Sequence, residues 1–325
     1  MTQHYVRPDV RRFLDYLNAL PGPRTHEVEP VVARQMFAAT KDLTDPPVGE
    51  LAVIRDLAIP RPDGGTIPAR LFDAQATRVP GPVMVFYHGG GFVFGDIDTH
   101  ASLCAEMARV LGLPVVSVDY RLSPEHRWPA APDDAEAAAR WVASNPAELG
   151  VAATALVLCG DSAGGMLTIN TAMALRDEPA AVPVIVQAPL YPVTDPAGRY
   201  PSFEEFADGF VLTKAAMLWF GDAYAADVTH PRGSPMTVDL SNLPPAIVVA
   251  ASLDPLRDQG RAYAARLIEA GVPVVYREAV GTIHGFATLR KAIPSAAGEI
   301  AGFLIALKAV VTECEAARVM AQAAG

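Results

Sequence analysis

One serine in this sequence lies where a serine can act as a nucleophile. Ser162 is the centre of the segment GDSAG at residues 160–164, which follows a short apolar run and precedes a run typical of a helix. The two glycines allow the sharp turn that lifts a serine hydroxyl above the carboxyl edge of a sheet. The amide of Ala163 would then lie at the amino end of the helix, where unpaired N–H groups favour a developing negative charge. The same pattern also fits a plain glycine-rich connection, so the rest of the chain has to decide.

A serine hydroxyl needs a histidine to take its proton and a carboxylate to orient that histidine. On a scaffold of this kind both follow the serine in the chain, the acid before the histidine, at the ends of later strands. Asp254 comes directly after the apolar run 246–253, and His284 follows the run 272–277. Asp258 is the rival acid, but it falls one helical turn into the next element. Asp254 would also suit the start of that helix as a cap.

A run of glycines offers the remaining part of such a site. The segment HGGGF at residues 88–92 comes straight after the predicted strand 83–87. Main-chain amides in a glycine run can approach a bound oxygen closely, as an oxyanion hole requires. We assign the donors to the amides of Gly89 and Gly90, together with that of Ala163. A phosphate-binding loop would use similar glycines, but the G-K-[ST] and G-x-G-x-x-G spacings are missing. The histidine of the segment is expected to fix this loop rather than to act as a base.

The composition excludes several classes of partner. Lys plus Arg number 26 against 36 Asp plus Glu, a net charge of -10, which disfavours nucleic acid and anionic membrane surfaces and favours a neutral organic substrate. No apolar run reaches the roughly 18 residues of a membrane span. Residues 1–20 mix charges among apolar residues and lack the core of a secretion signal, so we expect a cytoplasmic protein. The cysteines at positions 104, 159 and 314 show neither disulfide nor zinc spacing and are expected to be buried thiols.

Short runs rich in Val and Ile alternate with helical patterns over most of the chain. The runs 51–59 and 67–72 flank a turn at 62–65 and predict an antiparallel hairpin at a sheet edge. The later runs predict a mostly parallel central sheet flanked by helices, which is an α/β fold. Further strands are expected at 82–87, 114–118, 155–159, 182–188, 246–251 and 272–277, with helices at 99–111, 133–144, 166–176, 257–270 and 295–322.

The segment 191–243 interrupts this alternation, because it carries prolines, aromatic residues and helical patches but no convincing strand. We interpret it as an insertion that forms, with residues 1–45, a helical cap over the strand ends, where ligands of open α/β sheets bind. Residues 46–190 and 244–325 then form the two parts of the core. A long connection packed beside the sheet is the alternative, although structureless loops of that length are uncommon in compact domains.

Several segments, in this order along the chain, resemble the motif set of the hormone-sensitive-lipase family of bacterial esterases. They are HGGGF at 88–92, DYRLSPEH at 119–126, GDSAGG at 160–165, DPLRD at 254–258 and HGF at 284–286. The resemblance implies an α/β-hydrolase fold with a two-part helical cap, hydrolysis of carboxylic esters of short to medium acyl chain, and neither a metal nor a cofactor. It assigns the triad roles to Ser162, Asp254 and His284. It leaves the oxyanion role with the same three amides and is compatible with a homodimer.

The substrate pocket is expected where the core meets the cap. Phe210 and Trp219 of the insertion are candidates for its wall, as are Phe92 and Ile283 beside the catalytic motifs, although the aromatic residues of the insertion would also suit a small core of the cap itself. The same apparatus could hydrolyse an amide, and this fold can serve as a small-ligand receptor with its catalysis disabled. A receptor would usually have lost a triad residue, and all three are present. An ester hydrolase is therefore the function that the sequence predicts.

Overall fold

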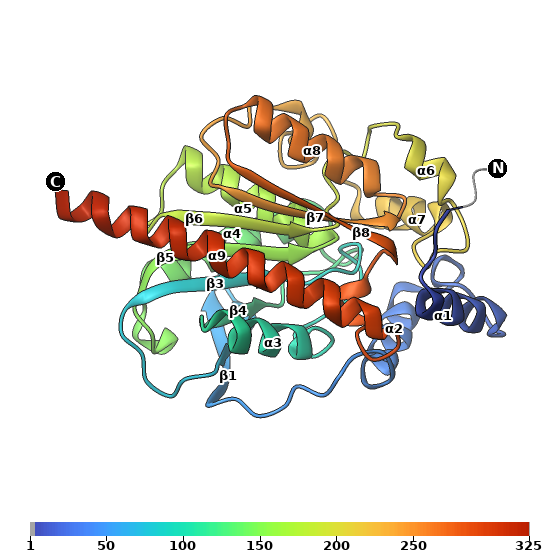
Figure 1. Ribbon diagram of the computed structural model, residues 1–325, viewed down its shortest axis with the longest axis horizontal. Helices are drawn as coiled ribbons and strands as arrows, with labels where there is room; N and C mark the ends of the chain where they lie inside the picture. The colour runs from blue at the N-terminus through green and yellow to red at the C-terminus, as the bar shows by residue number, and fades with distance from the viewer. Residues whose placement is uncertain (1–3, 325) are drawn as a thin grey trace.

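The core of the protein is one eight-stranded sheet, drawn in Figure 1 from a computed structural model that describes residues 4–324. The strands are β1 (Val53–Pro60), β2 (Thr66–Asp73), β3 (Gly81–Tyr87), β4 (Val115–Val118), β5 (Ala153–Asp161), β6 (Val184–Leu190), β7 (Ala246–Leu253) and β8 (Val274–Ile283). Their order across the sheet is β1-β2-β4-β3-β5-β6-β7-β8.

The directions of the strands agree with the pattern of the sequence. β1 and β2 form an antiparallel hairpin, with Leu57 opposite Ala69, and β2 is antiparallel to β4. From β4 to β8 all neighbouring strands are parallel, as expected when strands are connected through helices rather than through tight turns. The predicted hairpin and the mostly parallel sheet of an α/β-hydrolase fold are confirmed. The carboxyl ends of the parallel strands consequently lie along one edge of the sheet.

Helices cover both faces of the sheet, because strands buried on two sides present apolar side chains to each face. One face is covered by α3 (Ala101–Leu111) and α9 (Pro294–Ala324), and the other by α4 (Ala130–Ala143), α5 (Ala163–Asp177) and α8 (Arg257–Glu269). Within residues 4–324, no helix combines the length and the apolar character that crossing a membrane would need.

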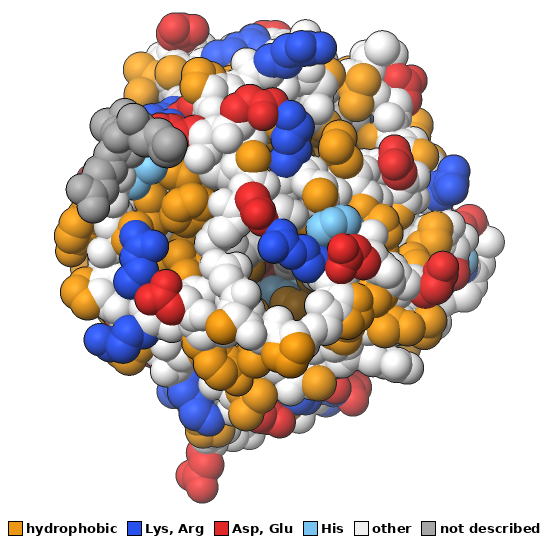
Figure 2. Space-filling view, turned by 90° about the vertical axis from the view of Figure 1, so that its right-hand side faces the viewer, with side chains coloured by type: hydrophobic (Ala, Val, Ile, Leu, Met, Phe, Trp, Pro, Cys, Tyr) orange, Lys and Arg blue, Asp and Glu red, His pale blue; other side chains and the backbone are white. Residues whose placement is uncertain are grey.

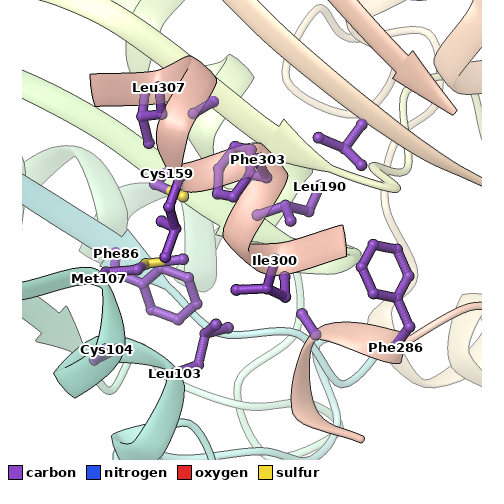
Figure 3. Packing of buried hydrophobic residues seen from close by; sticks show 14 of the residues in the cluster. Phe86, Leu103, Cys104, Met107, Cys159, Leu190, Phe286, Ile300, Phe303 and Leu307 are labelled. Atoms are coloured by element: carbon purple, nitrogen blue, oxygen red, sulfur yellow. The ribbon is translucent and has the colours of Figure 1, made fainter. Parts of the chain in front are cut away.

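The apolar layer on the side of α3 and α9 is drawn in Figure 3. Phe86 of β3 and Cys159 of β5 lie in the same cluster as Phe303 of α9, and all three side chains are fully buried. Burying a side chain of the size of Phe stabilises the fold by about 1.5–3 kcal/mol. Cys104 is buried, as predicted, and burial raises the pKa of its thiol to about 12. Cys314 differs from the prediction, because it lies on the distal part of α9 and is only half-buried.

Four further helices gather at one end of the molecule, on the right in Figure 1. α1 (Pro8–Ala19) and α2 (Pro30–Thr44) come from the amino-terminal segment, and α6 (Pro201–Glu205) and α7 (Lys214–Tyr224) come from the connection between β6 and β7, whose described residues contain no strand. α1, α2 and α6 begin with proline, whose fixed φ and missing N–H suit a first helical turn. The predicted segment boundaries also include residues 1–3 and 325, which lie outside the described residues. The short 3-10 turns are η1 (Thr25–Glu27), η2 (Ala147–Leu149), η3 (Pro235–Thr237) and η4 (Phe286–Thr288).

Candidate active site

Four strand ends bring together segments that are far apart in the chain. β3 is followed by His88, β5 by Ser162, β7 by Asp254 and β8 by His284. Because these parallel strands end at one edge of the sheet, the residues that follow them meet there. β8 continues beyond residue 277, where the sequence pattern had placed its end, as far as the residue before the histidine. The histidine is therefore attached directly to a strand end rather than to a flexible loop.

The backbone of Ser162 adopts the conformation of a sharp turn. Its φ of 55° and ψ of -115° lie outside the regions that residues with side chains ordinarily occupy, which costs on the order of 1–3 kcal/mol. The Ser162 amide donates to the carbonyl oxygen of Leu190 at 2.9 Å, which helps to hold the turn. Gly164 lies against the end of β3, where a methyl group would overlap the carbonyl oxygen of Tyr87. The serine therefore stands at the end of β5 with α5 beginning immediately after it.

Ser162, His284 and Asp254 form one hydrogen-bonded series. The Oγ of Ser162 is 2.8 Å from Nε2 of His284, and Nδ1 of His284 is 2.7 Å from Oδ2 of Asp254. Because an ionised carboxylate only accepts, Nδ1 carries the proton and Nε2 is left to accept from the serine hydroxyl. Asp254 is fully buried, and its Oδ1 accepts from the Leu256 amide at 2.8 Å, so it both orients the histidine and caps the following turn. The rival acid Asp258 instead pairs with neighbouring arginines.

The glycine loop after β3 differs from the prediction at one amide. The Gly89 N–H donates to Oδ1 of Asp161 at 2.8 Å, so it is already occupied and is not available to an oxyanion. Glycine is required at this position, because a methyl group on the Gly89 Cα would overlap the Asp161 carboxyl group. The assignment of an oxyanion donor to Gly89 is therefore corrected. The histidine of the loop has the structural role that was expected, since Nδ1 of His88 donates to the Gly89 carbonyl oxygen at 2.8 Å.

The amides of Gly90, Gly91 and Ala163 remain as candidate donors. Within residues 4–324, none of these three amides donates to a main-chain or side-chain acceptor outside regular helices. Ala163 is the first residue of α5, so its amide has no partner in the helix either. Gly90 and Ala163 were predicted for this role, whereas Gly91 was missed. The run of three glycines was the available signal, and the prediction took its first two members instead of its last two.

A pocket of about 490 Å³ lies above these groups. Figure 2 faces the end of the molecule that carries α1, α2, α6 and α7 and shows a hollow near its centre, with hydrophobic side chains below it and charged side chains along its upper side. Ser162 and His284 line the pocket together with the glycine loop and residues of α2 and α7, and no Lys or Arg occurs among the described lining residues. The aromatic residues that line it are Phe37, Phe92, Phe94, Phe203, Phe220 and Tyr224.

Of the four residues predicted to line the pocket, one does so and three do not. Phe92 lines it and stacks on Tyr224, with ring centroids 3.8 Å apart. Phe210, Trp219 and Ile283 are not among the lining residues, so these three predictions are corrected. Ile283 is fully buried at the end of β8. Phe210 packs against the apolar core and against the ring of its neighbour Phe206 at 5.3 Å, which is the alternative that the sequence had left open.

Sequence reasoning chose the wrong member of an adjacent aromatic pair on α7. Phe220 lines the pocket, and the preceding Trp219 does not. Successive residues of a helix point about 100° apart, so a shift of one position moves a side chain from the pocket to another side. Phe37 and Phe94 were also missed. Their pairing, with ring centroids 4.7 Å apart, joins α2 to the glycine loop and could not be read from residues so far apart in sequence.

Two buried ionisable groups lie beside the glycine loop and are among the residues that line the pocket. Nε2 of His100 is 3.3 Å from Oδ1 of Asp161, and both side chains are buried. Burial disfavours the charge on each group, but the charge and hydrogen bond of His100 outweigh it and lower the pKa of Asp161. The carboxylate of Asp161 in turn overcomes the effect of burial and raises the pKa of His100. The charged forms of the two groups therefore stabilise each other.

A serine, histidine and aspartate joined in series at the ends of parallel strands, beside unpaired amides at a helix start, define a serine hydrolase of the α/β-hydrolase class.

Comparisons with known proteins agree with this class. Residues 84–288 match the family described as alpha/beta hydrolase fold. The chain is 36% identical over 304 residues to an ethyl acetate hydrolase of Pseudomonas putida, a match that covers 90% of this chain and 95% of that protein. It is 38% identical over 278 residues to esterase LipI of Mycobacterium tuberculosis, covering 83% and 86% of the two chains.

The structure is similar to that of an ester hydrolase from the metagenome of Lake Arreo, solved in complex with a derivative of bipyridine phosphonate. The TM-score is 0.89 at 36% identity, and the match covers 94% of this chain and 98% of that one. The chain belongs to the α/β-hydrolase family and, within it, to the hormone-sensitive-lipase group of esterases. It is a carboxylesterase of the serine-hydrolase type.

Proposed function

We propose that this protein hydrolyses carboxylic esters of short to medium acyl chain, with Ser162 as the nucleophile, His284 as the base and Asp254 as the partner of the base. The observation that carries the proposal is the series of hydrogen bonds that joins these three side chains at the base of a mainly apolar pocket. A base within hydrogen-bonding distance of a nucleophile is what general-base activation requires. The helices α1, α2, α6 and α7 act as the cap of this pocket.

The reaction proceeds in two halves. His284 removes the proton of the Ser162 hydroxyl as Oγ bonds to the ester carbonyl carbon. The carbonyl oxygen becomes an oxyanion, which the three amides named above stabilise. When the bond to the alcohol oxygen breaks, His284 gives its proton to the departing alcohol. Water then attacks the acyl-serine, its proton passes to His284, and the carboxylic acid leaves as the serine is restored.

The size and lining of the pocket support the acyl range. A volume of about 490 Å³ lies toward the lower part of the roughly 300–1,000 Å³ found for small-molecule pockets. Each methylene that enters an apolar pocket contributes about 0.8 kcal/mol. Reactivity should therefore rise over the first carbons of the acyl chain and stop where the cap closes the pocket. The described lining residues include no Lys or Arg that would favour an acyl chain ending in a carboxylate.

A labelling experiment and a substrate series test the proposal together. A fluorophosphonate should modify one residue per chain, identified as Ser162 by peptide mass spectrometry, and Ser162→Ala should be neither labelled nor active. Esters of p-nitrophenol from acetate to laurate should give a kcat/KM profile with a maximum at short to medium length. Labelling at another residue, or full activity of Ser162→Ala, would refute the assignment.

We also propose that the protein forms a homodimer through the outer edge of β8. β8 is the last strand of the sheet, and an unpaired edge is a template for pairing with another strand. The amino-terminal segment covers only part of this edge, where the Arg7 amide donates to the carbonyl oxygen of Gly281 at 3.2 Å. Val275, nearer the start of the strand, is 36% exposed. Light scattering should give twice the chain mass, and Val275→Lys should give a monomer that retains esterase activity. A monomeric parent protein would overturn this proposal.

A further inference from the structure

His100 and Asp161 form a buried pair beside the glycine loop, at the wall of the pocket, that no step of the reaction above uses. His100 lies immediately before α3, and Asp161 is the last residue of β5, next to Ser162. Their exposed fractions are 1% and 4%, so both groups are largely shielded from bulk water. Oδ1 of Asp161 is 3.3 Å from Nε2 of His100 and accepts from the Gly89 amide at 2.8 Å. One carboxylate oxygen thus joins His100 to the glycine loop.

The contacts around His100 fit a proton on each ring nitrogen. Nε2 faces Asp161, which only accepts, so Nε2 donates. Nδ1 is 3.0 Å from Oγ1 of Thr99. With its single proton directed to the carbonyl oxygen of Asp96 at 2.9 Å, that hydroxyl accepts from the Asp96 amide at 2.9 Å and has a second lone pair for a proton on Nδ1. This arrangement fits an imidazolium ion at His100 with the carboxylate of Asp161 as its counter-charge.

We propose that His100 is a positioning residue for the oxyanion-binding loop and acts through Asp161 and the Gly89 amide, an inference that rests on the proposed function. The direction of the Gly89 peptide determines how the next two amides, those of Gly90 and Gly91, face the pocket. Such a constellation has to be held to within about 0.5 Å of its productive geometry. Consecutive glycines have no side chains that could be locked by packing, so hydrogen bonds must hold them. A charge-assisted bond to a buried carboxylate supplies that restraint.

The charge on His100 makes this positioning depend on pH. Burial acts to lower the pKa of His100, but the surrounding carboxylates, Asp161 first, raise it above the ordinary value of histidine. A histidine with a raised pKa keeps its proton at neutral pH and loses it only at higher pH, and the restraint on Asp161 weakens at that point. Turnover should therefore decline on the alkaline side. The ionisable groups that face His100 are Asp161 of β5, His88 of the glycine loop, Asp96 before α3, and Asp45 after α2, which is itself paired with Arg290.

The test compares the intact protein with two variants. His100→Gln keeps an N–H donor but carries no charge, and His100→Phe has neither. We expect kcat for p-nitrophenyl butyrate to fall roughly 10-fold in the first and roughly 100-fold in the second, approaching the roughly 10²–10³-fold loss seen when an oxyanion donor is removed. KM should change by less than about twofold, because the restraint matters chiefly in the transition state. A trifluoromethyl ketone, which forms a tetrahedral oxyanion with serine, should lose affinity in parallel, whereas butyrate should bind unchanged.

The control variants change residues of the same two types outside this network. His126→Gln and Asp98→Asn change an exposed histidine and an exposed aspartate and should keep the parent kcat. Asp161→Asn should lower kcat, and adding His100→Gln to it should cost less than the product of the separate effects, because both act through one hydrogen bond. The alkaline decline of kcat in the parent should be absent from His100→Gln.

The outcomes separate this inference from the proposed function. An unchanged kcat in His100→Gln, or fully multiplicative effects of the His100 and Asp161 variants, would overturn the positioning role. Phosphonate titration of Ser162 counts the intact sites in each preparation, so kcat is expressed per folded site. If His100→Phe does not fold, His100→Gln and the alkaline decline of the parent still decide. A parent protein that neither hydrolyses esters nor reacts with the phosphonate would contradict the proposed function instead.

Discussion

Arg34 of α2 donates from Nε to the carbonyl oxygen of Val93 at 2.7 Å, which binds the amino-terminal helices to the turn after the glycine loop. Its Nη2 also donates to the carbonyl oxygen of Ser123 at 2.8 Å, and its guanidinium pairs with the carboxylate of Glu125. The planar guanidinium presents several N–H donors in fixed directions, which an ammonium group does not. One side chain thus couples the amino-terminal helices to the loop that carries the proposed oxyanion donors.

Loss of this coupling should be measurable in both stability and binding. In Arg34→Met the carbonyl oxygens of Val93 and Ser123 lose their donor, so the free energy of unfolding should fall by about 1–3 kcal/mol and KM should rise several-fold. Arg34→Lys should be nearly as impaired, because a single ammonium group cannot reproduce the planar set of donors. Urea titration and steady-state kinetics would measure both effects. Wild-type values in Arg34→Lys would show that charge alone, rather than the bridge, matters.

Glu125 provides the pH dependence of the same contact. The hydrogen bond from Arg34 lowers the pKa of Glu125 from 4.5 to about 2. A lowered pKa means that the contribution to stability is present above about pH 4.5 and is lost as the pH falls toward 2. The parent should therefore be slightly more stable than Glu125→Gln at neutral pH, with the difference disappearing in acid. The effect is small because the carboxylate is 54% exposed. Thermal denaturation at pH values from about 2.5 to about 7, spaced by about one unit, would follow this difference in stability.

The triad should behave as one unit. Ser162→Ala and His284→Ala should each lower kcat by roughly 10⁴-fold or more, with Asp254→Asn the mildest, and combining them should add little. The reason is that the histidine has no proton to take without the serine, and the serine has no base without the histidine. Active-site titration would correct the rates for inactive protein. Losses that multiply across the three positions would show that the side chains act independently.

Much of this site could be predicted from the sequence because its functional side chains follow directly after strands. Ser162, Asp254 and His284 each follow an apolar run, and parallel strands bring their ends to one edge. The roles within the glycine run could not be predicted in this way. Which amide faces the pocket is decided by Asp161, which takes the Gly89 N–H across 72 positions of the chain.

The cap was less predictable than the core for a related reason. Prolines and apolar patches indicated that its segments contain helices, but the direction in which a side chain points depends on how the helix is rotated against its neighbours. Trp219 and Phe220 satisfy the same pattern, and only packing against Phe94, at 5.3 Å, distinguishes Phe220 as the pocket residue. The role of His100 could not be predicted from the sequence either, because Asp161 becomes its neighbour only in the folded protein.

A buried ion pair holds the segment after α2 to the loop that follows His284. Nη2 of Arg290 is 2.7 Å from Oδ2 of Asp45 and 2.8 Å from Oγ of Ser102. Asp45→Asn would leave a buried guanidinium without its counter-charge, so the free energy of unfolding should fall by about 3–5 kcal/mol. Asp208→Asn is the matched control, because its partner Arg24 is exposed and the pair is worth about 0–1 kcal/mol. Similar losses in the two variants, measured by urea titration, would argue against a structural role for the buried pair.

The length of the acyl chain that the pocket accepts should depend on Phe220 and not on Phe210. Phe220 lines the pocket from α7, and a methyl group on Gly91 would overlap its ring, so it stands directly beside the oxyanion-binding loop. Phe210 packs against Phe206 and the apolar core instead. The two residues are identical in type and lie in the same insertion. Their replacement by alanine therefore removes the same atoms from two different environments.

In Phe220→Ala the space vacated by the ring extends the pocket, so the preferred p-nitrophenyl ester should become longer by a few carbons. Each added methylene that enters the pocket is worth about 0.8 kcal/mol, or roughly a fourfold gain in kcat/KM, until the new wall is reached. Phe210→Ala should leave the length profile unchanged and lower the free energy of unfolding by about 1–3 kcal/mol, because it leaves a cavity in partly buried packing. The measurement is kcat/KM from acetate to laurate for the parent and both variants, with urea titrations alongside. A profile that shifts in Phe210→Ala and stays fixed in Phe220→Ala would mean that the wall of the acyl site lies in the part of the insertion before α7 and not on the helix itself.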